Sequence, residues 1–335
     1  MVPVVSTRVK ARKCEGDADD MKLWIVMVVV ASLLAGVLLW PVLRLASSVR
    51  PPPAARQAPP PRSVSATPTN STHRALAKPV LDSIPSRCAI ILGQEDGVSY
   101  NVRLAALKQL QPPLASNEVQ ALYLLLYRHS NEDPLPEDDL HAFKNEVTNT
   151  LRQQQPLLAD LPWHLLQMYA DQQQGEVWRD YCIQHLGALY HRADSSTRHA
   201  IADLFWQATA TKDGTIAGTT LLALEDNVRK ADVPRERLAA RALAIAQDET
   251  FGPEPRATAL QVCVLLGEHR ALVPARHLAR TQSPTILRIS AIGALGLLGE
   301  PADLSLLKPL TRDEDMRFRQ AAVAAVKRLT EAKEN

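Results

Sequence analysis

The chain has 335 residues, of which 46% are hydrophobic and only 4% aromatic, so it can bury a sizeable core and favours helices over sheets. Residues 1–95 carry 12 of the 38 Lys and Arg and 6 of the 36 Asp and Glu, although the formal net charge is only +2. Residues 96–335 therefore hold 26 basic and 30 acidic side chains, a balance that argues against the basic face of a nucleic-acid-binding domain.

The cysteines and histidines show no metal-ligand spacing. Cys14, Cys88, Cys182 and Cys263 lie far apart without a Cys-x-x-Cys pair, and the nine histidines never form His-x-x-x-His. We therefore expect no metal, no cofactor and no disulfide. Cys182 and Cys263 are expected to be small buried side chains on helices.

An uncharged apolar stretch near the N-terminus predicts a transmembrane helix. Leu23–Leu43 spans 21 residues, about the length that crosses a bilayer core of ~30 Å. Trp24 and Trp40 stand near its ends, and Lys22 and Arg44 flank it. A cleaved signal peptide is the alternative, but the stretch is longer than the usual apolar region of such peptides.

The charges around this stretch predict its orientation. Five Lys and Arg precede it and four follow it closely, which favours a cytoplasmic N-terminal segment at residues 1–22. We accordingly expect a single-pass protein of a bacterial inner membrane, with its C-terminal domain in the periplasm.

Residues 44–87 read as a linker. The part from Arg50 to Arg74 is rich in Pro, Ala, Ser and Thr and has almost nothing to bury. Such a composition predicts an extended, semi-rigid spacer between the membrane and the following domain.

From about residue 96 onward, apolar residues recur at spacings of three and four, which predicts a series of short helices. The short apolar run Cys88–Leu92 is the one place where a strand remains open. The predicted helices cover Val102–Leu110, Val119–Leu126, Leu140–Leu151, Leu161–Met168, Val177–Leu189, Arg198–Ala208, Gly218–Leu224 and Leu238–Ala246.

The C-terminal part repeats itself. The stretch Arg256–Glu268 aligns with Arg288–Glu300 at an offset of 32 residues, and a third copy begins at Arg319, 31 residues later. A period in the thirties with two helices per unit predicts a solenoid, because one helical hairpin cannot bury its own apolar faces.

The segment from Ile289 to Val326 resembles HEAT repeats, specifically the short kind named for phycobilisome lyases. The residues that carry the resemblance are Ala294, Leu295, Gly296, Gly299, Asp313, Asp315, Phe318, Arg319 and Ala322. The resemblance implies an all-α, HEAT/armadillo-like solenoid over residues 88–335, with its best-defined repeats at 253–331. It also implies stacked helix pairs with a concave surface that holds partners.

The glycines of the repeat are interpreted as architectural. They match no phosphate-binding pattern and lie within or at the end of a helix rather than before one. Gly267 and Gly299 are predicted to end their helices in the left-handed conformation. Gly293 and Gly296 are predicted to permit close approach of a neighbouring helix.

The charged residues of the repeat are also interpreted as structural. Asp313 and Asp315 are expected to cap the following helix. Arg256, Arg288 and Arg319 occupy matching positions, which predicts a ladder of arginine contacts along one edge.

A group of large aromatic residues is the best sequence candidate for binding a partner. If the rings line the concave surface they would be anchors, whereas packing between helices is the alternative. The candidates are Trp163, Tyr169, Trp178, Tyr181 and Trp206.

Taken together, these features predict a membrane-tethered HEAT-repeat scaffold or adaptor. It would bind protein partners, and neither nucleic acid nor a small-molecule substrate, on its concave surface, without catalytic, cofactor-binding or metal-binding residues. The alternative is a lyase-like or cofactor-handling HEAT-repeat enzyme.

Overall fold

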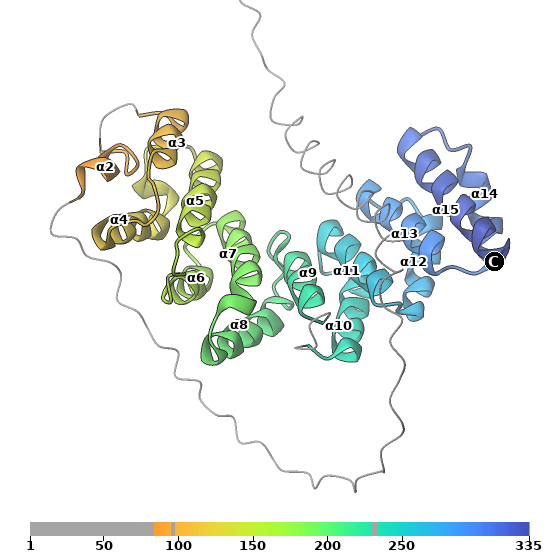
Figure 1. Cartoon of the computed structure of the whole chain (residues 1–335). Coiled ribbons are helices and arrows are strands. Elements are labelled where there is room, and N and C mark those ends of the chain that lie inside the picture. Colours follow the sequence, from red (N-terminus) through yellow and green to blue (C-terminus); the bar gives the residue numbers. More distant parts are fainter. Residues whose placement is uncertain (1–83, 95–97, 229–232, 335) are drawn as a thin grey trace, which may run out of the picture. The chain divides into compact units, whose positions relative to one another are not determined.

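The computed structural model describes residues 84–94, 98–228 and 233–334, which all belong to one compact unit, Ser71–Asn335. Over these ranges the chain forms α-helices joined by turns and 3-10 helices, with no β-strand (Figure 1). The all-α prediction is therefore confirmed. The N-terminal half contains α2 (Ser86–Ala89), α3 (Tyr100–Lys108), α4 (Ser116–Tyr127), η2 (Ser130–Glu132), α5 (Glu137–Arg152), α6 (Leu161–Ala170), α7 (Glu176–Leu189), η3 (Tyr190–Arg192) and α8 (Ser195–Ala208). The C-terminal half contains α9 (Ile216–Val228), α10 (Arg235–Gln247), α11 (Pro253–Leu265), η4 (His269–Ala271), α12 (Leu272–Arg280), α13 (Thr285–Leu298), η5 (Pro301–Asp303), α14 (Leu304–Leu310) and α15 (Met316–Glu334).

The helices begin and end at residues whose chemistry suits those positions. The Asp194 carboxylate accepts a hydrogen bond from the Thr197 amide at 3.0 Å and so caps the start of α8. Pro253 opens α11, where its missing N–H would have had no partner. Beyond α11, Gly267 has a φ of +64°, the left-handed conformation expected for it.

Gly299 differs from its equivalent in the preceding repeat. Its φ of −66° and ψ of 169° are extended, so the predicted left-handed ending is wrong here. The turn closes through the Asp303 carboxylate, which accepts a hydrogen bond from the Glu300 amide at 2.9 Å. Glycine is still required, because a Cβ would lie 2.1 Å from the carbonyl oxygen of Leu295.

The two glycines inside α13 also behave differently from each other. A Cβ on Gly296 would lie 2.7 Å from the Cα of Ala325 in α15, so this glycine allows the two helices to approach closely. A Cβ on Gly293 would meet nothing within 4 Å. The predicted close approach is thus found at Gly296 and is wrong for Gly293.

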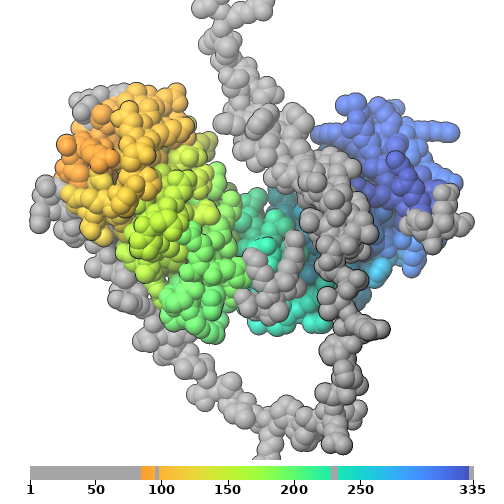
Figure 2. Space-filling view, viewed as in Figure 1, coloured from red at the N-terminus to blue at the C-terminus, as the bar shows by residue number. Residues whose placement is uncertain are grey.

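The odd-numbered helices pack in a continuous row. From α3 to α15, each makes extensive contacts with the odd-numbered helix before it and the one after it. The even-numbered helices pack on their neighbours in the chain, and all the extensive contacts join elements close in sequence. Figure 2 shows this order as successive colours that occupy adjoining parts of the surface.

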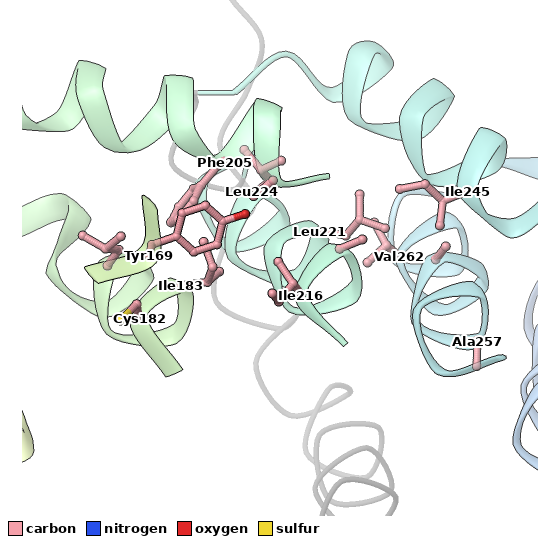
Figure 3. Close-up of a cluster of buried hydrophobic side chains, with 14 of the residues drawn as sticks. Tyr169, Cys182, Ile183, Phe205, Ile216, Leu221, Leu224, Ile245, Ala257 and Val262 are labelled. Carbon is pink, nitrogen blue, oxygen red and sulfur yellow. The ribbon is translucent and has the colours of Figure 1, made fainter. Parts of the chain in front are cut away.

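The core runs between these helices rather than around one centre. Figure 3 shows one section, in which side chains of α7, α8 and α9 point toward one another and the cluster continues to α10 and α11. The labelled members of this section are Tyr169, Cys182, Ile183, Phe205, Ile216, Leu221, Leu224, Ile245, Ala257 and Val262. Cys182 and Cys263 are buried, as their helical positions predicted.

No helix in the described ranges combines the length and the apolar character needed to cross a bilayer. The predicted location in a bacterial inner membrane is corrected accordingly and is not carried further. The predicted span at residues 23–43, the segment at 1–22 and most of the linker at 44–87 lie outside the described residues.

Candidate ligand site

The aromatic residues singled out in the sequence lie against the core. Trp178 and Tyr169 are buried, with 0% and 6% of their surfaces exposed. Trp163, Tyr181 and Trp206 are partly buried and pack against the same core. These positions serve packing between helices, and binding of a partner through the exposed parts of these rings stays a prediction.

The repeat arginines connect α11, α13 and α15 to the backbone at or after the end of the preceding helix. The guanidinium of Arg256 donates to the carbonyl oxygen of Ala246, and that of Arg288 donates to Ala279, both at 3.3 Å. Arg319 donates to the carbonyl oxygen of Asp313 at 2.8 Å. Each of these arginines therefore joins the start of its own helix to the backbone at or after the end of the preceding helix.

The acidic repeat residues organise the turn before α15. The Asp313 carboxylate accepts from the Asp315 amide at 3.0 Å and lies 3.4 Å from Arg288. Asp315 accepts from the Arg317 amide at 2.8 Å at the start of the helix. These contacts hold the turn and cap the helix.

Three further cations upstream make the same contact. Arg103 donates to the carbonyl oxygen of Ile91 at 2.8 Å, Lys144 to that of Arg128 at 2.5 Å and Arg179 to that of Tyr169 at 3.1 Å. The sequence reasoning missed these positions because the upstream repeats are faint. A signal existed in the dipeptides Phe-Lys, Trp-Arg and Phe-Arg that end at Lys144, Arg179 and Arg319.

Several of these cations also lie over an aromatic ring at the start of the next odd-numbered helix. Arg103 lies 4.7 Å from the ring centre of Phe143, and Arg288 lies 4.3 Å from that of Phe318. Lys144 lies 5.2 Å from the indole of Trp178. Cation–π attraction thus adds to the hydrogen bonds that join adjacent repeats.

Lys144 has no carboxylate within 4 Å among the described residues, unlike Arg103, Arg179 and Arg288, which each pair with an aspartate. Arg103 is paired with Asp133 at 2.6 Å, whereas the ammonium of Lys144 donates to the amide oxygen of Gln174 at 2.9 Å. Burial would raise the pKa of Asp133, but its hydrogen bonds, the first from Arg103, hold it below its usual value. Burial lowers the pKa of Lys144 from 10.5 to about 8.

A polar recess of about 340 Å³ lies beside Gln174, the hydrogen-bond partner of Lys144. Its walls come from the turn after α4, the start of α5 and the turn before α7. Every lining side chain is polar: His129, Ser130, Asn131, Glu137 and Gln173. Lys144 and Gln174 anchor the neighbouring backbone, since the Gln174 amide donates to the carbonyl oxygen of Tyr127 at 3.0 Å.

Carboxylates outnumber cations at the recess. The imidazole of His129 lies 3.0 Å from Asp171 through Nε2 and 3.5 Å from Glu132 through Nδ1. Glu137 accepts a hydrogen bond from the Ser130 hydroxyl at 3.1 Å, and its side chain is 59% exposed. Even with His129 protonated, the three carboxylates leave a net negative charge.

His141 lies beside Glu137 and does not neutralise it. It is 3% exposed, and its Nε2 is 3.8 Å from the Glu137 carboxylate. Burial, reinforced by the charge of Lys144, lowers the pKa of His141. A neutral His141 leaves Glu137 as a carboxylate available to a ligand.

The recess is suited to a small, hydrophilic, positively charged group. Carboxylate, hydroxyl and amide oxygens are acceptors for ammonium N–H groups, and charge-assisted hydrogen bonds are stronger than neutral ones. Among the described residues, no group of three or more His, Cys, Asp and Glu side chains is arranged to hold a metal ion. The acceptors that line the recess can form hydrogen bonds with an ammonium group.

A second recess, of about 160 Å³, lies between the start of α10 and the end of α11. Three of its charged side chains already have partners: Arg270 pairs with Glu268 at 2.6 Å, and Arg235 donates to the carbonyl oxygen of Leu266 at 2.5 Å. Gly267 also lines this recess, so the recess is part of the turn after α11.

Comparison with known proteins found no matching family model and no matching curated protein. A match among solved structures is human deoxyhypusine hydroxylase in complex with glycerol, at 18% identity and a TM-score of 0.32, covering 73% of this chain and 96% of that one.

This match corrects the functional prediction. Because a matched protein is an enzyme, the prediction of a membrane-tethered scaffold or adaptor without catalysis is withdrawn. At this level of similarity the match transfers neither a reaction nor a residue role to the present chain.

Proposed function

We propose that the described helices form an α-solenoid of HEAT-like hairpins. Two observations support it. The extensive contacts join only elements close in sequence, and a cation with the same backbone contact recurs in all the odd-numbered helices from α3 to α15 except α9. An array in which each unit contacts only its neighbours is the defining property of solenoids. The sequence resemblance of residues 289–326 to HEAT repeats adds to this proposal.

We further propose that this array binds a small organic cation in the recess beside α5. The observation that carries the proposal is a recess of about 340 Å³ lined by polar side chains, with Glu137 lacking a cationic partner that is protonated at neutral pH. Ligand sites span roughly 300–1,000 Å³ and are mostly apolar. A recess at the lower end of that range with polar walls suits a small, hydrophilic ligand.

The ligand class is a linear di- or polyamine. Such a molecule carries several ammonium groups. Glu137 lines the recess, and the lining imidazole of His129 is flanked by Glu132 and Asp171, which supply a second group of carboxylates. Ammonium groups spaced along a chain can pair with both carboxylate groups, whereas a single small cation pairs with one.

Calorimetric titration of the 335-residue chain with spermidine tests the proposal. Glu137→Gln removes one charge-assisted hydrogen bond, worth about 1.5–3 kcal/mol, so its affinity should fall at least about tenfold. Glu249→Gln is the matched control, because it makes the same charge change at an exposed site outside the recess. Equal affinity in both variants, or no saturable binding by the unaltered chain, would overturn the proposal.

Mass spectrometry of the recovered ligand extends the same experiment. A chemical change in spermidine after incubation with the chain, but not with Glu137→Gln, would show that the recess also supports a reaction.

A further inference from the structure

The side of α5 that points away from the polar recess carries two carboxylates. Glu137 and Lys144, on the side of the recess, are seven residues apart and share one side of the helix. Asp139 and Glu146 are also seven residues apart, and each follows its counterpart by two residues, about 200° of rotation around the helix axis. Asp139 and Glu146 therefore lie on a surface distinct from the recess.

Within the described ranges, neither of these carboxylates has a cationic partner. No Lys, Arg or His nitrogen of those ranges lies within 4 Å of the Asp139 or Glu146 side chain. Asp139 is exposed and Glu146 is partly exposed, so a ligand can reach both from solvent. Seven residues along a helix separate them by about 10.5 Å. The surface thus offers two negative charges at a fixed spacing.

A tyrosine from each neighbouring helix of the odd-numbered row flanks these carboxylates. Tyr100 begins α3 and lies edge to face against Phe143 of α5, with the ring centres 5.9 Å apart. Tyr181 lies in α7, the helix that follows α5 in the row. Both tyrosine rings are partly buried against the core, and in the part of the chain that the structure describes neither hydroxyl has a hydrogen-bond partner.

The charges of α5 act on both tyrosine hydroxyls. Burial, followed by the charges of Glu146 and Asp139, raises the pKa of Tyr100. Burial, followed by the charges of Asp180 and Glu146, raises the pKa of Tyr181. Glu146 therefore lies near both rings, and both tyrosines are neutral at physiological pH.

An exposed apolar side chain extends the surface along α7. Val177 lies one turn before Tyr181 on the same side of the helix, and 43% of it is exposed. Tyrosine is enriched among the residues that dominate binding energy at protein interfaces, and a surface of one charge favours a partner of the opposite charge. The combination favours a cationic peptide.

We propose that this surface of α3, α5 and α7 binds a peptide segment with two arginines in the spacing Arg-x-x-Arg. A guanidinium group forms bidentate pairs with carboxylates and stacks on aromatic rings, which suits Glu146 beside Tyr100 and Tyr181. A second guanidinium would pair with Asp139. In a polyproline II peptide, residues three apart lie on the same side and about 9.3 Å from each other, close to the spacing of the two carboxylates.

Fluorescence anisotropy of a short labelled peptide that contains Arg-Pro-Pro-Arg, titrated with the 335-residue chain at physiological ionic strength, tests the proposal. The matched peptide with Lys-Pro-Pro-Lys carries the same charge but lacks the planar guanidinium groups. We expect saturable binding of the arginine peptide, at least about fivefold tighter than that of the lysine peptide. Equal affinity for the two peptides would reduce the interaction to general charge attraction and overturn the proposal, as would the absence of saturable binding.

Glu146→Gln is the informative variant, because Glu146 is partly exposed and has no ion-pair partner in the described ranges whose loss would disturb the fold. Its affinity for the arginine peptide should fall at least about tenfold, because hydrogen bonds between charged groups are the strong ones. Glu249→Gln, with the same charge change at an exposed site elsewhere, should bind as the unaltered chain does. Equal affinity in both variants would refute the surface. Spermidine affinity should be unchanged in Glu146→Gln, so the peptide surface and the polar recess fail separately.

Discussion

Among the cations that donate to the backbone at the end of the preceding helix, Lys144 has a pKa of about 8, so its charge changes in the range from pH 8 to 10.5. Lys144 is 1% exposed, and its ammonium donates to the Arg128 carbonyl and to Gln174. Burial lowers its pKa from 10.5 to about 8. Below pH 8 the side chain is protonated in both the folded and the unfolded chain, and the folded state bears the full desolvation penalty. Between pH 8 and 10.5 the unfolded chain keeps a proton that the folded chain releases, so stability rises with pH.

Because stability rises with pH through Lys144, the free energy of unfolding should depend on pH differently in the unaltered chain and in Lys144→Met. The free energy of unfolding of the unaltered chain should rise relative to the variant from pH 8 to 10, by at most about 1.4 kcal/mol per pH unit. Denaturant unfolding across that range measures it. Lys108→Met, which removes an exposed lysine, should follow the unaltered chain in this respect. If the free energy of unfolding had the same pH dependence in Lys144→Met and in the unaltered chain, burial of Lys144 without a carboxylate partner would be contradicted.

At the scale of elements, replacing each of the two glycines of α13 by alanine should change the free energy of unfolding in opposite directions. Gly296→Ala would place a Cβ 2.7 Å from Ala325, so it should lower the free energy of unfolding by about 1–3 kcal/mol through overpacking. Gly293→Ala meets nothing within 4 Å and should raise it, by up to about 1 kcal/mol, because alanine favours the helix. Denaturation midpoints of the two variants compare the same change on the same helix. Equal effects would show that α15 is not packed against Gly296.

Most helices could be predicted from the spacing of apolar residues, because burying one face of a helix imposes that spacing. The prediction at 140–151 lies within α5, and that at 198–208 lies within α8. Ambiguity remained at Cys88–Leu92, where α2 occupies Ser86–Ala89, because so short an apolar run has no distinguishable period. The left-handed conformation predicted for Gly299 is wrong because a close contact and a left-handed backbone both require glycine, and the sequence does not distinguish these two requirements.

The polar recess could not be predicted because its walls are distant in sequence. Gln173 meets residues more than 30 positions earlier only after α5 and α6 have packed. The acidic stretch after His129 was a possible signal, but charged turns are common on protein surfaces.

At the scale of the whole molecule, contacts limited to neighbours predict local rather than uniform responses to mutation. Gly296→Ala should increase native-state hydrogen exchange in α13 and α15 and leave α3 to α5 largely unchanged, because no extensive contact joins these regions. Hydrogen exchange followed by mass spectrometry resolves the two ends of the chain. An equal loss of protection in every helix would contradict the solenoid proposal, since it would show that the chain opens as one cooperative unit.

We propose that the recess beside α5 binds an organic cation through Glu137. A crystal structure of the chain grown with spermidine tests it most directly. We expect an ammonium nitrogen within hydrogen-bonding distance, about 2.7–3.2 Å, of the Glu137 carboxylate, with a second ammonium facing the Glu132–His129–Asp171 group. Spermidine bound elsewhere, or a recess that holds only water at saturating spermidine, would contradict the account.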